Sequence, residues 1–260
     1  MAAMAATLDR PSTIFKSGDE IPPLWHWLYF LETTAQGQLA EDGHAKKGEF
    51  LPPIDLPRRM WAGSRVEFLQ PLHVGEQASR LSRIKSIEIK QGRSGELGFV
   101  TVEHTISGPN GIALREEHDI VYREAATPQA ASMSTQSASV QADFSKILHA
   151  GPVLLFRYSA LTFNSHRIHY DREFSKSREG YPGLVVHGPL LAALMLELLT
   201  SSIPGNKVLQ FQFRAMRPIF DHTPFTVCCN NSDDTGRAAL WISDQTGALC
   251  MQGSALVMEN

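Results

Sequence analysis

The residues from Leu190 to Leu199 read LLAALMLELL and form one strongly apolar run in this chain. Leu, Ala and Met favour helix, no Gly or Pro interrupts the run, and its hydrophobicity extends all round a helix, so a buried helix is predicted. Gly188 and Pro189 come directly before it, and proline is tolerated in the first turn of a helix. The rest of the chain must therefore supply surfaces that cover this helix.

Several segments have the pattern of antiparallel strands. They carry β-branched and aromatic residues near a period of two, with Gly, Asn and Asp between them. The segments are Arg83–Lys90, Gly98–Ile106, Leu209–Arg214, Phe225–Cys229 and Ala238–Ile242. The pattern predicts a curled antiparallel sheet that wraps around a central helix.

The two halves of the chain resemble each other weakly but in a consistent order. FLQPLHVGE around Pro71 and AMRPIFDHTPF around Pro218 each precede strand-like segments. Further on, Ile-Ser followed by Gly111 in the first half corresponds to Ile-Ser followed by Gly247 in the second. Both pairs flank a turn of the kind that joins antiparallel strands. The sequence therefore predicts two similar units.

A segment rich in Ser, Ala, Thr and Gln separates these units and is predicted to be a linker. The predicted organisation is a first unit at residues 1–124, a linker at 125–143 and a second unit at 144–260. In the first unit Leu24–Gln38 is the candidate helix. That unit contains no counterpart of the polar cluster from Asn164 to His169, so it is predicted to keep the shell of the fold without the chemistry.

Composition excludes several classes of protein. The chain has 260 residues, of which 43% are hydrophobic and 20% charged, as expected for a globular protein. A net charge of -3 without a basic stripe gives no basis for nucleic-acid binding, and no apolar run is long enough to span a membrane. Cys228, Cys229 and Cys250 fit neither a zinc spacing nor a disulfide framework. We expect a cytoplasmic protein without a secretory signal.

Polar groups that can carry chemistry gather just before the apolar run. Asn164, His166, His169 and His187 all precede Leu190. The free N–H groups and the positive end of the helix dipole at Gly188 would stabilise developing negative charge, such as a carbonyl oxygen that becomes an enolate. The spacing of the histidines does not follow a helical HExxH frame, so no metal site is predicted.

The stretches FNSHRIHYD (163–171) and GYPGLVVHGPL (180–190) resemble the signature of the hot-dog-fold hydratases and dehydratases of acyl thioesters, the MaoC or R-specific enoyl-CoA hydratase superfamily. The chain is most similar to the branch of type 2 hydroxyacyl-thioester dehydratases and of itaconyl-CoA and mesaconyl-C(4)-CoA hydratases. LPRRMWAGSRVEF (56–68) and HWLYF (26–30) extend the resemblance over nearly the whole chain. It implies an α+β double hot-dog, two antiparallel sheets that are each wrapped on a helix and joined as a pseudo-dimer.

The resemblance also implies roles for single residues. The superfamily motif carries an aspartate and, five residues on, a histidine; these positions fall on Asn164 and His169. Because an amide has no useful basicity, His169 is left as the general base, and Asn164 can only orient a water or a carbonyl. Gly188 falls at the oxyanion-hole N–H. His166 and His187 are either structural or catalytic, and Asp171 either orients His169 or caps a nearby segment.

Substrate contacts are expected from a further set of residues. A dicarboxylic acyl group would need a cationic partner, for which Arg58 and Arg59 are the candidates. Arg167 belongs to a group of cations that either form a solvated face or hold the phosphates of coenzyme A, together with Arg172, Lys176 and Arg178. The motif adds Tyr181 and His187 as further substrate-binding candidates.

The function that the resemblance implies is reversible hydration of an α,β-unsaturated acyl-CoA, with no cofactor beyond the CoA that the substrate carries. The expected pair is citramalyl-CoA with itaconyl-CoA or mesaconyl-C(4)-CoA. A general 3-hydroxyacyl-thioester dehydratase of type 2, an acyl-CoA thioesterase and a non-catalytic acyl-thioester-binding subunit are the alternatives. An acyl-CoA is the expected partner, nucleic acid and membrane are not, and a homo-oligomer is left open.

Overall fold

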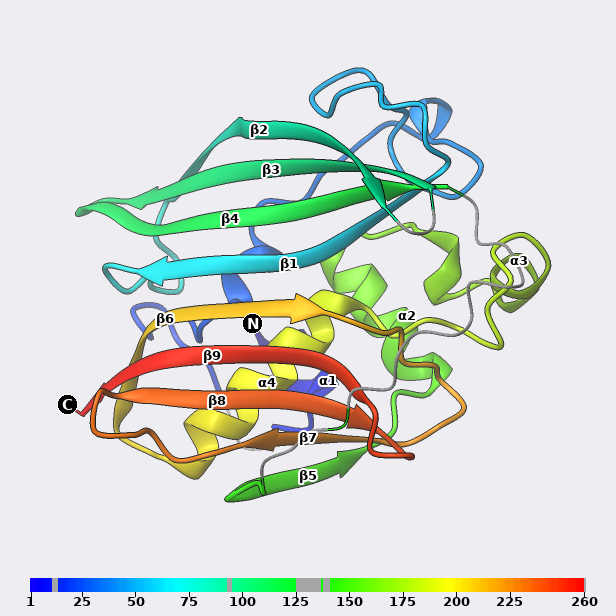
Figure 1. Cartoon of the computed structure of the whole chain (residues 1–260). Helices are drawn as coiled ribbons and strands as arrows, with labels where there is room; N and C mark the ends of the chain where they lie inside the picture. The colour runs from blue at the N-terminus through cyan, green and yellow to red at the C-terminus, as the bar shows by residue number, and fades with distance from the viewer. Residues whose placement is uncertain (11–13, 93–94, 125–136, 138–140, 260) are drawn as a thin grey trace.

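Nine strands form one continuous antiparallel sheet in the computed structural model (Figure 1). The structure describes all residues except 11–13, 93–94, 125–136, 138–140 and 260. The order across the sheet is β2-β3-β4-β1-β6-β9-β8-β7-β5. The strands are β1 Arg58–Phe68, β2 Ser79–Gly92, β3 Gly95–Gly108, β4 Gly111–Arg123, β5 Phe144–Leu148, β6 Asn206–Ala215, β7 Phe225–Cys229, β8 Arg237–Asp244 and β9 Leu249–Glu259.

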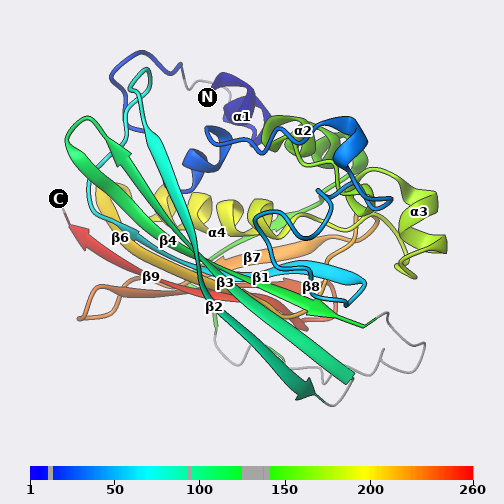
Figure 2. The same ribbon diagram turned by 90° about the horizontal axis from the view of Figure 1, so that it is seen from above.

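The helices gather on one side of this sheet (Figure 2). Short 3-10 segments join them in the loops that cross the same face. The α-helices are α1 Ala2–Thr7, α2 Pro152–Thr162, α3 Arg172–Ser177 and α4 Gly188–Ser202, and the 3-10 helices are η1 Trp25–Leu28, η2 Gln36–Gln38 and η4 Arg167–His169. No helix in the described ranges combines the length and apolar character that a membrane crossing requires.

The predicted buried helix is confirmed. α4 begins at Gly188, has Pro189 in its first turn and packs against β5 to β8. Its buried side chains belong to the main core and come from both sides of the helix; they are Leu190, Leu191, Ala192, Ala193, Met195, Leu196 and Leu199. Burying each leucine side chain contributes about 1.5–3 kcal/mol of transfer free energy, so α4 fixes the core of the second unit.

The predicted repeat is visible in the strand order. β1 and β6 lie side by side at the centre, with Val66 opposite Phe211. The strands then follow in the same order on either side, β4-β3-β2 beyond β1 and β9-β8-β7 beyond β6. The turns β3–β4 and β8–β9 contain Gly111 and Gly247, whose φ values of 109° and 81° favour glycine. The predicted α+β double hot-dog, joined as a pseudo-dimer through one sheet, is confirmed.

The candidate helix Leu24–Gln38 is wrong in its length and type. Only the 3-10 turns η1 and η2 form there, and Leu24 has a left-handed φ of 69°. Its aromatic residues pack singly instead of along one helical stripe: Trp25 is buried in the main core, whereas Tyr29 is exposed. Instead of a helix, the loop before β1 covers the inner face of β3 and β4. Side chains of the loop and of the two strands form a small core there, of Leu51, Ile54, Leu56, Val100, Val102 and Tyr122.

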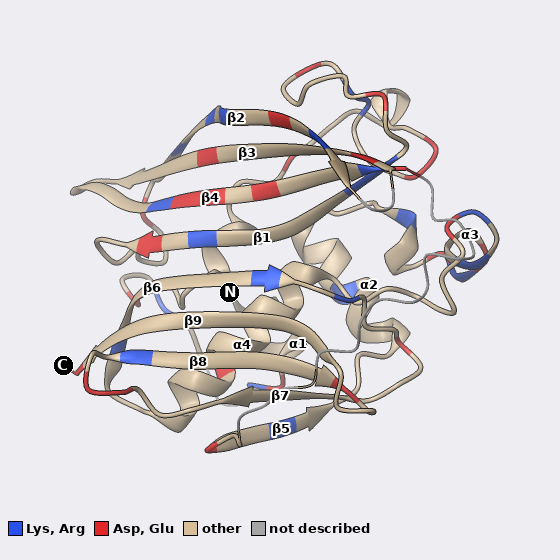
Figure 3. Ribbon diagram, viewed as in Figure 1, with Lys and Arg blue, Asp and Glu red and all other residues tan. Residues whose placement is uncertain are grey.

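The boundaries of the two predicted units remain predictions. β4 ends at Arg123 and β5 begins at Phe144, whereas most of the predicted linker, residues 125–143, lies outside the described residues. Charged side chains of the sheet are concentrated on β1 to β4, as Figure 3 shows, and are sparse on β9. The two halves of the sheet therefore differ in surface chemistry although they share a strand order.

Candidate active site

A large cavity of about 1730 Å³ lies where the two halves meet. The second half contributes the end of α2, the α2–η4 segment and the first turn of α4. The first half contributes β1 and the loop that contains Asp42 and His44. Of the predicted site residues, Asn164, His169, Gly188, Arg58, Arg59 and Tyr181 line the cavity, whereas Arg167 and His187 do not.

His169 lies in η4 and is buried, with one edge on the cavity. Its Nδ1 is 2.7 Å from the carbonyl oxygen of Val185. A carbonyl only accepts, so Nδ1 carries the hydrogen and Nε2 carries a lone pair. Burial lowers the pKa of His169 to about 4, and the hydrogen bond to Val185 opposes that shift only partly. At neutral pH the imidazole is therefore a neutral base with its tautomer fixed.

Two further histidines flank His169. The His187 ring stacks on it with centroids 3.7 Å apart, and His187 Nε2 lies 2.8 Å from the hydroxyl of Ser159. His187 is almost fully buried behind His169 and away from the cavity wall, so its position supports a structural role rather than substrate contact. His166 lines the cavity, and its ring centroid is 5.4 Å from that of His169. Burial, and to a smaller extent the charges of the neighbouring histidines, lower the pKa of His166 to about 2.

Asn164 follows the C-terminal end of α2, where Phe163 has a left-handed φ of 51°. The side-chain Oδ1 of Asn164 accepts a hydrogen bond of 3.0 Å from the backbone N–H of His166. This contact shapes the turn that presents His166 and His169. The amide NH2 of Asn164 is the group left to donate to a ligand, and neither group of the side chain can take a proton from carbon.

The first turn of α4 provides the donors expected at this position. Gly188 lines the cavity, and within the described chain no carbonyl or side chain accepts a hydrogen bond from its backbone N–H. A Cβ at this glycine would meet only the carbonyl oxygen of Trp61, at 3.9 Å. The open N–H at the positive end of a buried helix is suited to stabilising an oxyanion.

The three arginines predicted to bind substrate have different surroundings. Arg58 is held by Glu179, with 3.0 Å between its Nε and the carboxylate, and lies over the ring of Tyr181. Arg59 lines the cavity and forms no ion pair with any described residue. Arg167 pairs with Asp171 at 2.7 Å and packs on Phe174, away from the cavity. The prediction that Arg167 binds substrate or CoA is not supported by this geometry.

The side chain of Asp171 caps a helix. Its carboxylate accepts a hydrogen bond of 3.0 Å from the backbone N–H of Phe174 at the start of α3, and Asp171 forms no hydrogen bond with His169. Of the two roles left open for it, capping is the one that the structure supports.

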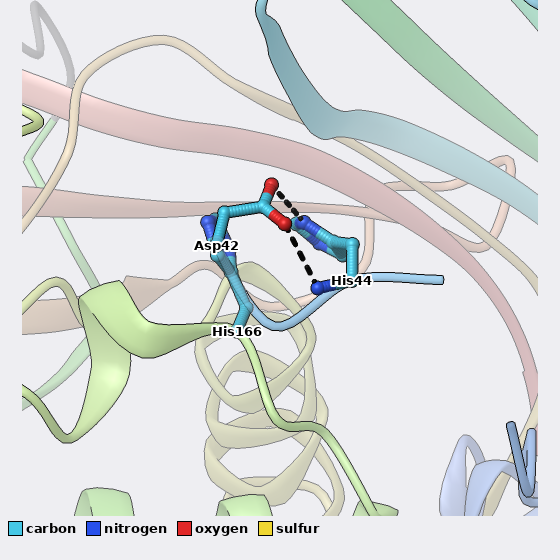
Figure 4. Close-up of side chains that lie close together, drawn as sticks. All are labelled: Asp42, His44 and His166. Atoms are coloured by element: carbon cyan, nitrogen blue, oxygen red, sulfur yellow. Dashed lines mark hydrogen bonds and ion pairs between the residues drawn. The ribbon is translucent and has the colours of Figure 1, made fainter. Parts of the chain in front are cut away.

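Two groups on the cavity wall were not found from the sequence. Asp42 and His44 lie in a loop of the first half, and the His44 ring contacts the His166 ring at 3.9 Å between centroids (Figure 4). Arg217, in the loop that follows β6, also lines the cavity, and its buried Nη1 has no hydrogen-bond partner among the described residues. These residues sit in ordinary polar loops, so no local pattern distinguished them.

The first half also supplies an aromatic wall. Buried Glu116 accepts hydrogen bonds from His26 at 2.9 Å, from Trp27 at 2.8 Å and from His118 at 2.5 Å. His118 packs against Trp61 with centroids 4.0 Å apart, and both line the cavity. Although burial opposes ionisation of Glu116, the charge and hydrogen bonds of these histidines hold its pKa well below its usual value. This network fixes the wall rigidly.

Comparison with known proteins agrees with this arrangement. Residues 24–221 match the family of hydroxyacyl-thioester dehydratase type 2. Mesaconyl-C(4)-CoA hydratase from Chloroflexus aurantiacus is 46% identical over 232 residues, which cover 89% of this chain and 82% of that protein. Hydroxyacyl-thioester dehydratase type 2 from Schizosaccharomyces pombe is 28% identical over 85% of this chain and 80% of that protein.

Solved structures share the fold at low sequence identity. The crystal structure of HtdX from Mycobacterium tuberculosis superposes with a TM-score of 0.67 and 16% identity, over 100% of this chain and 94% of that one. A MaoC-like dehydratase from Phytophthora capsici gives a TM-score of 0.63 and 17% identity, over 84% of this chain and 80% of that one. These similarities support the hot-dog architecture.

Proposed function

Because this chain belongs to the hydroxyacyl-thioester dehydratase type 2 family, we propose that its substrate is mesaconyl-C(4)-CoA, which it hydrates reversibly to citramalyl-CoA. The chain is a hydro-lyase of the hot-dog fold. The proposal concerns the acyl group. Its main support in the structure is Arg59, which forms no ion pair with a described residue and lines the same cavity as His169 and Gly188.

The reaction matches the groups that face the cavity. In mesaconyl-C(4)-CoA the double bond is conjugated with the thioester, so water adds to Cβ and negative charge develops on the thioester oxygen. The Gly188 N–H donates a hydrogen bond to that oxygen and stabilises its charge, and Nε2 of His169 exchanges the proton at Cα. In the dehydration direction His169 removes the α-proton and the β-hydroxyl leaves as water.

Itaconyl-CoA is the other acyl group that the sequence indicated. Its double bond is not conjugated with the thioester, so an oxyanion donor at the thioester gives its hydration less help. The structural argument therefore favours the mesaconyl isomer as the molecule that reacts directly. The aromatic wall of Trp61 and His118 gives an apolar contact to the methyl group of the mesaconyl isomer or to the methylene group of the itaconyl isomer.

Both isomers carry a second carboxylate, which needs a cation inside the cavity. Arg59 and Arg217 each line the cavity, and neither forms an ion pair with a described residue. Arg58 is already neutralised by Glu179. We therefore assign the carboxylate to Arg59 or Arg217 rather than to Arg58.

Truncating the correct arginine tests this assignment. Arg59→Met or Arg217→Met should cost about 2–5 kcal/mol in kcat/KM for mesaconyl-C(4)-CoA, because a buried carboxylate would lose its partner, and should affect crotonyl-CoA little. Arg65→Met is the matched control, since Arg65 lies on β1 but pairs with Asp119 outside the cavity. Equal losses on both substrates, or hydration of crotonyl-CoA as fast as of the dicarboxylic thioester, would contradict the assignment.

Three further expectations accompany this function. We propose that no cofactor is needed beyond the CoA of the substrate. Cations on the cavity wall, among them Lys46, Arg123 and Arg178, are available for the CoA phosphates. A cytoplasmic location remains a prediction, and the sequence leaves self-association open.

A further inference from the structure

We propose that Asp42 and His44 form a second proton-transfer pair of the active site, which acts at the β-hydroxyl while His169 acts at Cα. The inference rests on the proposed hydratase function and deepens it. In this pair His44 is the catalytic residue and Asp42 is a positioning residue.

The contacts between Asp42 and His44 define the state of the imidazole. Asp42 Oδ2 lies 2.9 Å from His44 Nδ1, and Asp42 Oδ1 accepts a hydrogen bond of 3.0 Å from the backbone N–H of His44 (Figure 4). The carboxylate therefore holds the hydrogen on Nδ1 and leaves Nε2 to exchange a proton with a ligand. A carboxylate in this position also stabilises the imidazolium that forms.

The pair lies against the catalytic motif on the cavity wall. Asp42, His44, His166 and His169 all line the cavity, and donor atoms of the first three lie within 4.8 Å of one another. Asp42 on the same loop contacts His44. His166 and His169 on the facing segment interact with the charge of His44, and Arg59 on β1 interacts with His166.

The loop is fastened to the catalytic segment by three hydrogen bonds. The backbone N–H of Arg167 donates to the Asp42 carbonyl at 2.8 Å, and Ser165 Oγ donates to the Gly43 carbonyl at 2.5 Å. Arg167 Nη1 donates to the Glu41 carbonyl at 3.2 Å. Arg167, which the sequence assigned to ligand binding, thus serves to hold this loop.

Gly43 shows how close the approach is. Its φ is 89°, and a Cβ there would lie 1.8 Å from the carbonyl oxygen of Ser165. Only glycine allows this contact between the two backbones. The position of Asp42 and His44 against the motif is therefore built into the backbone, as expected for part of an active site.

The chemistry needs a second group. Dehydration removes a proton from Cα and must also protonate the leaving hydroxyl, but Asn164 stands where a second acid or base would be expected and cannot ionise. In the proposed step His169 Nε2 takes the α-proton, the freed electron pair forms the double bond, and the Cβ–O bond breaks. The leaving oxygen takes the proton of His44 Nε2 and departs as water. Exchange of protons with solvent then restores neutral His169 and protonated His44.

The charge state of Asp42 suits this role. Burial alone would raise its pKa, but the hydrogen bonds and charge of His44 outweigh burial and lower the pKa below the usual range of an aspartate. The carboxylate therefore stays ionised next to the imidazole over the neutral range. Hydration runs the same steps backwards, with His44 Nε2 taking a proton from the attacking water.

The same three side chains could also be considered as metal ligands, since their donor atoms are close. The hydrogen on His44 Nδ1 that faces Asp42 leaves only Nε2 free, and in the proposed step that nitrogen transfers a proton and holds no metal. Purified protein should therefore keep its rate after dialysis against a chelator. Loss of activity that returns with added zinc would overturn the proposal.

The first experiment compares variants of the pair. His44→Gln should lower kcat by about 10²–10⁴-fold on citramalyl-CoA with little change in KM, the range typical of general acid–base catalysis. Asp42→Asn keeps an oxygen that can accept the backbone hydrogen bond but removes the charge, so kcat should fall less. Because the imidazolium of His44 loses its stabilising partner, the fall in the dehydration rate at high pH should begin at a lower pH than in the wild type. A kcat of His44→Gln within threefold of wild type, or an increase in KM without a change in kcat, would overturn the proposal.

A matched control exists on the surface. The Glu76 carboxylate accepts a hydrogen bond from the backbone N–H of His73 and lies 3.1 Å from His73 Nδ1. This repeats the arrangement of Asp42 and His44 at a place away from the large cavity. His73→Gln and Glu76→Gln should leave kcat and its pH profile unchanged. Thermal unfolding of all four variants shows whether a rate loss comes from misfolding.

The second experiment isolates the step that His44 performs. A 3-chloroacyl-CoA loses chloride without needing a proton, so His44→Gln should eliminate it at a rate within about tenfold of wild type. His169→Gln should stay inactive on it, because the α-proton must still be removed. Equal loss in both variants on the chloride substrate would remove His44 from the leaving-group step. If wild type converts none of these thioesters, the proposed function fails; if wild type is active and His44→Gln dehydrates citramalyl-CoA at a similar rate, only the pair fails.

Discussion

His169 is the residue on which the proposed chemistry depends most. Its Nδ1 is committed to the Val185 carbonyl, its ring is stacked on His187, and its free nitrogen faces the cavity. His169→Ala should lower kcat by about 10²–10⁴-fold or more, while the affinity for a CoA product stays near normal. Steady-state kinetics and a CoA-binding titration measure both. A near-normal rate would transfer the role of base to His166.

Asn164 gives an informative companion variant. Asn164→Asp should keep the oxygen that accepts from the His166 N–H and should add a group that can ionise. If the site is short of a proton-transfer group, the rate should be kept or should rise. A large loss in kcat at unchanged stability would mean that the donor group of the amide is itself required.

Acid should destabilise the folded protein through its buried histidines. Burial lowers the pKa of His169 to about 4, against about 6.5 in an unfolded chain. Between these values the unfolded state binds a proton that the folded state does not, so stability is complete above pH 6.5 and falls as the pH decreases towards 4. His169 alone should contribute about 2 kcal/mol of loss between pH 6.5 and 5. Urea unfolding at both values measures this, and His169→Gln should reduce the difference.

The sequence predicted only part of the site at the residue scale. His169 and Gly188 were recognisable because they lie in one continuous motif beside a strongly apolar helix. Asp42, His44 and Arg217 were not, because they reach the cavity from loops whose residues look like ordinary solvated turns. Arg167 was assigned to ligand binding since a charge alone does not reveal whether a partner such as Asp171 neutralises it.

At the scale of elements, strong periodicity was sufficient and isolated aromatics were not. The five predicted strand segments all fall within β2, β3, β6, β7 and β8, and the apolar run became α4. Leu24–Gln38 failed because its aromatic residues do not share one helical face. The helix α2 was missed, since its sequence, PVLLFRYSALT, has only a weak difference between its two faces.

The loop around Gly43 offers a test at this scale. Gly43→Ala should lower kcat by at least about tenfold, because a Cβ that would lie 1.8 Å from the Ser165 carbonyl must push the loop away from the motif. Gly18→Ala is the matched control: its φ is 91°, but nothing lies within 4 Å of the added Cβ, so backbone strain occurs without displacement. Similar kinetics for the two variants would mean that the loop is not part of the active site.

At the scale of the whole molecule, the repeat places two unlike units against each other. The mirrored strand order joins them at β1 and β6, and the cavity takes residues from both. The expected division into a catalytic unit and a bare shell is therefore incomplete, since the first unit lines the cavity with His44, Arg59 and Trp61. These contacts depend on how the two halves pack against each other, and the sequence pattern of either half alone does not reveal that packing.

The most direct test of the proposed activity is to incubate the purified chain with mesaconyl-C(4)-CoA and to follow the acyl-CoA by mass spectrometry together with free thiol. We predict conversion to citramalyl-CoA, seen as the gain of one water, approach to the same equilibrium mixture from either side, and no release of CoA. Release of free thiol would instead identify a thioesterase. An unchanged thioester in the presence of tight binding would contradict the account by showing a protein that binds acyl-CoA without converting it.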